Sequence, residues 1–203
     1  MDNSIIKAIK ERRSVRSFEE KDVDKELLEK IIQAGKYAPS AQNKQPWKFI
    51  VITNKNFIQE LSRDVKGELK KLLKWRFIKK FSIKELKDRE LLKFLFIIAV
   101  SKKDVIFFDA PALVLVLTEN KLFYDESCAC CAENMMLTAH SLGLGSCWIG
   151  FASVLGLKEK IMEKIGVPDN HHISAALIFG HPKGKTGRAP MRKIGSDVIK
   201  WIE

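Results

Sequence analysis

The segment Ala112–Thr118 (ALVLVLT) constrains the fold of this chain more than any other. It is a continuous apolar run closed by a threonine, and it directly follows Pro111. A strand with one face in water alternates polar and apolar residues, whereas a strand without alternation is buried on both faces. The run therefore predicts a strand inside a sheet that is covered by other elements on both sides.

Helical and extended patterns are interspersed around this run. We expect a short N-terminal helix that carries Ile5, Ile6 and Ile9, and a second helix capped by Asp24 and ended before Pro39. Further helical patterns cover Phe57 to about Leu95, Glu126–Leu142 and Leu157–Ile165, and further strands are predicted at Trp47–Thr53 and His172–Phe179. The pattern predicts an α+β fold, an α/β sandwich in which helices cover a small central mixed sheet of four or five strands.

The chain of 203 residues is predicted to form a single domain, 1–203, because no Pro/Gly/Ser-rich linker divides it. The helix Glu126–Leu142 is apolar on most sides, which is typical of the middle of a protein or of a subunit interface. The apolar tail Val198–Ile202 lies so late in the chain that it also needs a surface to dock on. Both features favour an oligomer.

Charge and hydropathy exclude several classes of protein. The 36 Lys and Arg outnumber the 25 Asp and Glu, but the excess is concentrated from Lys55 to Lys103 at helical spacing, as on solvated helix faces. Because no RNA-binding or zinc-finger signature accompanies these cations, we expect no nucleic-acid partner. The longest apolar run, Phe94–Val100, is too short to span a bilayer. The first 20 residues are charged rather than signal-like, so we expect a cytoplasmic protein with no membrane partner.

Four cysteines stand at positions 128, 130, 131 and 147. Three of them crowd into one predicted helix, where neighbouring side chains diverge, so they do not form a disulfide framework. Cys128 and Cys131 share a helix face with Cys147 following, which leaves a metal site conceivable. The spacing fits reduced thiols packed as small apolar side chains better, and we predict no metal.

Three polar or glycine-rich segments are candidates for binding. The first is Arg12-Arg13-Ser14-Val15-Arg16, which follows the N-terminal helix. Three guanidinium groups and a hydroxyl suit a phosphate or another oxyanion, and the alternative is a solvated basic turn.

The second segment is the loop from Ala38 to Trp47 (APSAQNKQPW). Its hydroxyl and amide groups can pair with the edge of a heterocycle, while the alternative is a capped turn before a strand. The third segment is Gly143–Gly150 (GLGSCWIG), where glycines allow a ligand to approach the backbone closely. It follows a helix and lacks the G-x-G-x-x-G spacing of a dinucleotide site, and its alternative is a helix terminator with a tight turn.

In this order, and together with Asp109-Ala110-Pro111 and the block from Glu133 to Gly150 (ENMMLTAHSLGLGSCWIG), these segments resemble the nitroreductase-like flavoprotein family. The resemblance covers nearly the whole chain. It implies a nitroreductase-like fold with bound FMN, NADH or NADPH as electron donor, and a ping-pong cycle. It also implies a homodimer with two FMN sites at the subunit interface, on which the C-terminal tail docks.

The resemblance implies specific cofactor contacts from the first segment. Arg12, Arg13, Ser14 and Arg16 hold the phosphate, the ribityl chain and the pyrimidine edge of FMN. Arg12 pairs with the phosphate, and Arg16 reaches the flavin ring. A basic residue near the C-terminus completes the phosphate site, for which Arg188 and Arg192 are the candidates.

The remaining implied contacts come from the other two segments. Pro39, Ser40 and Asn43 of the second subunit line the same flavin, and Ile149 and Gly150 place backbone amides near flavin N5 and O4. No contact is assigned between Lys55 and Asp104, because that region does not align with the family. His140 is interpreted as a core histidine with its hydrogen bonds satisfied.

The implied activity is hydride transfer from NAD(P)H through flavin N5 to a small electron-poor molecule such as a nitroaromatic, a quinone or an enone. No catalytic side chain is predicted, because the flavin carries the chemistry. Two alternatives stay open. One is a flavoprotein of the same fold with different chemistry, such as ene reduction, dehalogenation or flavin breakdown. The other is a non-enzymatic module whose basic face meets an acidic partner.

Overall fold

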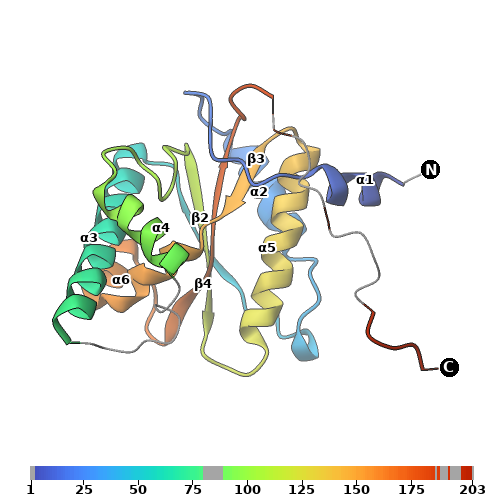
Figure 1. The fold of residues 1–203 in the computed structure, drawn as a ribbon. Helices are drawn as coiled ribbons and strands as arrows, with labels where there is room; N and C mark the ends of the chain where they lie inside the picture. Colours follow the sequence, from blue (N-terminus) through green and yellow to red (C-terminus); the bar gives the residue numbers. More distant parts are fainter. Residues whose placement is uncertain (1–2, 80–88, 186, 188–191, 193–197, 203) are drawn as a thin grey trace.

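The computed structural model describes residues 3–79, 89–185, 187, 192 and 198–202. The helices are α1 (Ser4–Glu11), α2 (Lys25–Gly35), α3 (Lys55–Lys79), α4 (Arg89–Val100), α5 (Tyr124–Ser141) and α6 (Glu159–Ile165), with 3₁₀ helices η1 (Ala41–Asn43) and η3 (Gly150–Leu157). The strands are β1 (Lys48–Ile52), β2 (Ala112–Glu119), β3 (Gly145–Trp148) and β4 (His171–Gly180). In Figure 1 the sheet stands between α3, α4 and α6 on one side and α2 and α5 on the other.

The four strands form one sheet in the order β1-β2-β4-β3. All three strand pairs are antiparallel, with Lys48 opposite Leu117, Ala112 opposite Phe179 and Gly145 opposite Gly180. The expected mixed sheet is therefore wrong for these strands, because each neighbour in the sheet runs in the opposite direction. The one parallel pairing among the described residues is an isolated bridge from Ser14 to Ser146 at the β3 edge.

β2 confirms the prediction from its sequence. Its leucines at 113, 115 and 117 face a core formed with α3, which includes Ile58 and Leu61. Its other residues at 112, 114 and 116 face a second core, which includes Ile31 of α2 and Met135 of α5. Side chains alternate between the two faces of a strand, so a strand that is apolar at every position joins both cores.

Helix boundaries follow local chemistry, but the capping of α2 and the packing of α5 differ from expectation. Asp24 is the N-cap residue of α2, but its side chain makes no capping hydrogen bond; its carbonyl accepts from Leu27 and Leu28 at 3.0 and 3.2 Å. α5 ends where Gly143 adopts a φ of 76° and the Leu144 N–H donates to the Ala139 carbonyl at 2.8 Å, as in a Schellman motif. Most apolar residues of α5 are buried against its own chain, so this helix alone does not require a partner.

Candidate functional site

The segment Arg12–Arg16 is held in extended form against the edge of the sheet. The Val15 N–H donates to the Ser146 carbonyl at 2.9 Å, which attaches the segment to β3. This approach requires a glycine at position 145, because a Cβ atom there would lie 2.7 Å from the Cβ of Val15. The arginines therefore owe their position to pairing with the predicted glycine-rich segment.

Arg12 and Arg13 line a cavity of about 190 Å³ together with His140 and Ser146. The Nε of Arg13 and the Oγ of Ser146 are buried and have no hydrogen-bond partner among the described residues. Buried polar groups are nearly always satisfied, so two such groups in one cavity mark it as a candidate binding site for a polar ligand. A donor set of guanidinium and hydroxyl groups matches a phosphate or a similar oxyanion.

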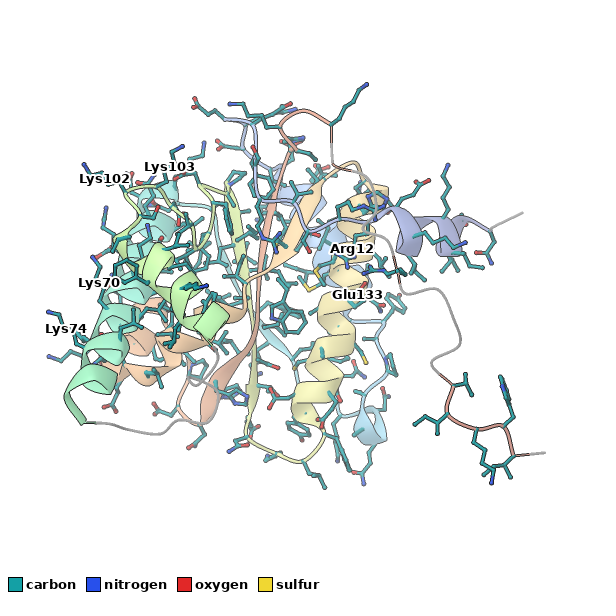
Figure 2. All side chains as sticks on the ribbon, in the orientation of Figure 1. Arg12, Lys70, Lys74, Lys102, Lys103 and Glu133 are labelled. Carbon is teal, nitrogen blue, oxygen red and sulfur yellow. The ribbon has the colours of Figure 1, made fainter. Side chains whose placement is uncertain are left out.

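Figure 2 shows Arg12 directed toward Glu133 on α5. The Arg12 Nε lies 3.4 Å from Glu133 Oε1, and the arginine side chain is 22% exposed. The Arg13 Nη1 donates to the carbonyls of Lys10 and Arg12 at 2.6 and 2.5 Å. Both guanidinium groups are thus positioned by their own chain before any ligand binds, which lowers the entropy cost of binding.

Arg16 lines a different cavity, of about 840 Å³. Its guanidinium carbon is 5.9 Å from the centroid of the Phe108 ring, within the range of a cation–π contact. Phe108 has a φ of 59°, a strained value for an aromatic residue. This turn is held by the Asp104 carboxylate, which accepts from the N–H groups of Ile106, Phe107 and Asp109 at 3.0 to 3.1 Å.

Cys147 is buried next to Ser14 and Arg16. Burial raises the pKa of this thiol, and the neighbouring Arg16 cation opposes that shift only in part. The thiol therefore stays protonated near neutral pH. A protonated thiol is a poor nucleophile, so Cys147 serves as a packing residue under the arginine segment.

The loop that contains Pro39, Ser40 and Asn43 lies elsewhere. Its Ala41 N–H donates to Ser127 Oγ near the start of α5 at 3.3 Å, whereas Arg12 contacts Glu133. The two contact positions are separated by about 9 Å along the axis of α5, at 1.5 Å per residue. Pro39 and Ser40 instead line a separate shallow hollow of about 220 Å³. One chain therefore does not bring this loop together with Arg12 and Arg13.

The third segment is predicted to offer the backbone amides of Ile149 and Gly150, and these two amides differ in whether a ligand can reach them. The Ile149 N–H donates to the Ala176 carbonyl at 2.8 Å, so it is not available to a ligand. This corrects the expectation for Ile149, and the physical reason is that the chain up to Ile149 stays paired with β4. Gly150 is exposed at the first position of η3, where helix N–H groups have no partner within the helix.

Of the two predicted C-terminal cations, Arg192 is exposed, and Arg188 lies outside the described residues. His140 is half-buried and lines the 190 Å³ cavity, so its interpretation as a core histidine is wrong. Ser146, Glu133 and Phe108 also belong to these sites although the sequence analysis gave them no role. Ser146 and Glu133 stand in the block that carried the family resemblance, which is the signal that points to them.

A group of exposed lysines lies away from the arginine cavity. Figure 2 shows Lys70 and Lys74 along α3 and Lys102 and Lys103 after α4, on the far side of the molecule from Arg12. All four are exposed, and Lys70 and Lys74 lie on α3, as expected for a solvated helix face. Among the described residues, no group of three or more His, Cys, Asp or Glu side chains is placed to hold a metal ion. Across the same residues, no helix is long and apolar enough to cross a membrane.

Comparison with known proteins identifies the family. Residues 9–181 match the nitroreductase family model, and the chain belongs to this family of oxidoreductases. A crystal structure of a nitroreductase with bound FMN from Bacteroides fragilis is 29% identical, with a TM-score of 0.79 over 98% of this chain and 100% of that one. A second FMN-bound nitroreductase, from Desulfitobacterium hafniense, is 24% identical with a TM-score of 0.78 over both full chains, and supports the fold.

A relative from Methanothermobacter thermautotrophicus is named provisionally as an NADH dehydrogenase/NAD(P)H nitroreductase. It is 25% identical over 188 residues, which cover 90% of this chain and 80% of the relative. The family and the nitroreductase-like fold predicted from the sequence are thereby confirmed.

Proposed function

We propose that this protein is an FMN-dependent oxidoreductase. It takes a hydride from NADH or NADPH and passes it, in a ping-pong cycle, to a small electron-poor acceptor such as a nitroaromatic, a quinone or an enone. The observation that carries the proposal is the cavity at Arg12 and Arg13, with its orphaned Arg13 Nε and Ser146 Oγ. The FMN-bound structure from Bacteroides fragilis and the name of the Methanothermobacter relative support it.

The residues fit FMN on chemical grounds. Two guanidinium groups and a buried hydroxyl converge on a cavity of phosphate size, and no dinucleotide glycine fingerprint accompanies them. Arg16, three residues beyond Arg13 in the same segment, lines the larger cavity. One short segment can thus contact two separate parts of one ligand, because three residues of extended chain span about 10 Å.

When bound, the flavin supplies the hydride chemistry. Arg12, Arg13 and Ser146 would hold the phosphate. Arg16, in cation–π contact with Phe108, would stabilise negative charge on the pyrimidine edge of the ring. The Gly150 N–H would donate to the ring edge. None of these roles requires a side chain to act as nucleophile or general base.

We propose that the working unit is a homodimer. The isoleucines of α1 are exposed, with Ile5 at 67%, and no described residue of α1 is buried. The tail Val198–Ile202 leaves the body of the molecule, and Trp201 is 77% exposed (Figure 1). A second copy that covers these surfaces would also supply the Pro39, Ser40 and Asn43 loop, which does not line the arginine cavity of its own chain.

The deciding experiment is to release the cofactor from the purified protein by heat and identify it by chromatography. FMN is the expected product. FAD, or no flavin after reconstitution, would overturn the proposal. A panel of nitroaromatics, quinones, enones and halogenated aromatics, run with NADH and with NADPH, then separates the proposed reaction from ene reduction, dehalogenation and flavin breakdown.

A further inference from the structure

The cavity at Arg12 and Arg13 has an unusual position for an anion site. It lies at the carboxyl end of α5, against His140, Gly143 and Leu144. The negative end of the helix dipole disfavours an anion there, in contrast to phosphate sites at helix N-termini. A phosphate bound in this cavity therefore needs more positive charge than one bound at a helix N-terminus.

The described charges around the cavity largely cancel. Arg12 and Arg13 are opposed by Glu11, which lines the same cavity, and by Glu133, whose carboxylate contacts Arg12 at 3.4 Å. His140 is the remaining titratable side chain among the described residues that line the cavity. It stands two turns after Glu133, on the same face of α5, in the last turn of the helix.

We propose that His140 binds the FMN phosphate in its protonated form, so that binding of FMN takes up a proton. This inference rests on the proposed function and assigns His140 as a cofactor-binding residue. The phosphate dianion of bound FMN favours the imidazolium over the neutral ring. The cation offsets the charge that Glu11 and Glu133 remove from the two arginines, and it donates an N–H to a phosphate oxygen.

The test is calorimetry with the full chain freed of flavin, at pH 8 in two buffers of different ionisation enthalpy. At this pH a phosphomonoester is already a dianion and histidines are ordinarily neutral. A proton that is taken up on binding must therefore be bound by the protein. Titration with FMN should show uptake of a substantial fraction of a proton, and titration with riboflavin, which lacks the phosphate, should show none.

Variants assign the proton to its site. His140→Gln should abolish the uptake and weaken FMN binding roughly 10- to 100-fold, with riboflavin affinity unchanged. His140→Lys keeps a cation and should restore FMN affinity without any uptake. His171→Gln, at the start of β4, is the matched control and should behave as the wild type in both titrations.

The outcomes separate the two proposals. If the wild type binds FMN without proton uptake, or if uptake persists in His140→Gln, the role of His140 is overturned and the proposed function stands. If the wild type does not bind FMN, the proposed function falls as well. Unchanged riboflavin affinity in the variants shows that the flavin site has kept its fold, so a loss confined to FMN reports on the phosphate contact.

Discussion

Two polar segments of this molecule are predicted to contact the same ligand but are held in different ways. Arg12–Arg16 is attached to β3 by a backbone hydrogen bond, and it leaves buried donors without partners. The loop Pro39–Asn43 uses its polar groups internally: Ser40 Oγ accepts from the Gln45 N–H at 3.0 Å, and Asn43 Oδ1 accepts from Gln45 Nε2 at 3.2 Å. The first segment has buried donors that a ligand could satisfy, and the second satisfies its polar groups within itself.

The comparison shows that the two segments would contribute to the proposed flavin site in different ways. The charged segment is held by one chain: Arg12 contacts Glu133 and Arg13 donates to two backbone carbonyls, because a partly buried guanidinium is costly unless it is paired or hydrogen-bonded. The loop keeps its own shape, with Gln42, Asn43 and Gln45 in the left-handed backbone conformation, and it needs no ligand to order it. It would contribute to a flavin site only when a second copy presents it.

The largest effect is expected from Gly145→Ala, which disrupts the close contact between β3 and the Arg12–Arg16 segment. The new Cβ would lie 2.7 Å from Val15, so Arg12 and Arg13 are displaced together and FMN affinity should fall at least about 100-fold. Fluorescence titration measures the affinity. Gly67→Ala in α3 is the control, because a Cβ there meets no atom within 4 Å. Wild-type affinity in Gly145→Ala would show that the segment does not need this close approach.

Arg12→Ala should have the next largest effect. Loss of one charge-assisted phosphate contact costs about 1.5–3 kcal/mol, or roughly 10- to 150-fold in FMN affinity. The same titration checks it, with the exposed Arg63→Ala on α3 as a control of equal charge. If both variants bind FMN equally well, Arg12 is a surface residue and the first segment is no better prepared than the second.

A truncation after Gly195 probes the other half of the comparison. It removes the exposed apolar side chains of Val198–Ile202, each worth about 1.5–3 kcal/mol when buried. The dimer dissociation constant should rise at least about tenfold, and FMN should be lost with it. Light scattering should give twice the chain mass for the wild type at micromolar concentration, and a variant that lacks only Glu203 is the control. A wild-type monomer that keeps its flavin would contradict the interface.

The smallest effect is expected from replacing all four cysteines with alanine. Burial raises the pKa of Cys128 to about 11 and that of Cys131 to about 12, so these thiols stay protonated from pH 6 to 9 and supply no nucleophile. Reduction of bound flavin by NAD(P)H, followed by its absorbance, should persist with an unchanged pH profile. Complete loss of reduction in a folded, FMN-loaded variant would revive a thiol or metal role.

Local patterns account for most of the secondary structure. β2 follows from its unbroken apolar run, and β1 and β4 follow from short β-branched segments, because burial on a sheet selects such residues. β3 could not be predicted, since GSCW has little strand propensity and owes its form to pairing with β4 and to the approach of Val15. The long pattern from Phe57 to about Leu95 became two helices, α3 and α4, since periodicity does not show where a helix pair turns.

The sequence by itself determined the chemistry of the candidate site: three arginines in one short segment, a polar loop and a glycine-rich block, in the order shared with the nitroreductase family. Only the tertiary structure decided which of these meet. It placed Arg12 and Arg13 with His140 and Ser146, turned Arg16 to another cavity, and engaged the Ile149 N–H with β4. The reason is physical: residue type sets what a group can bind, but strand pairing and helix packing join positions that are far apart in the chain.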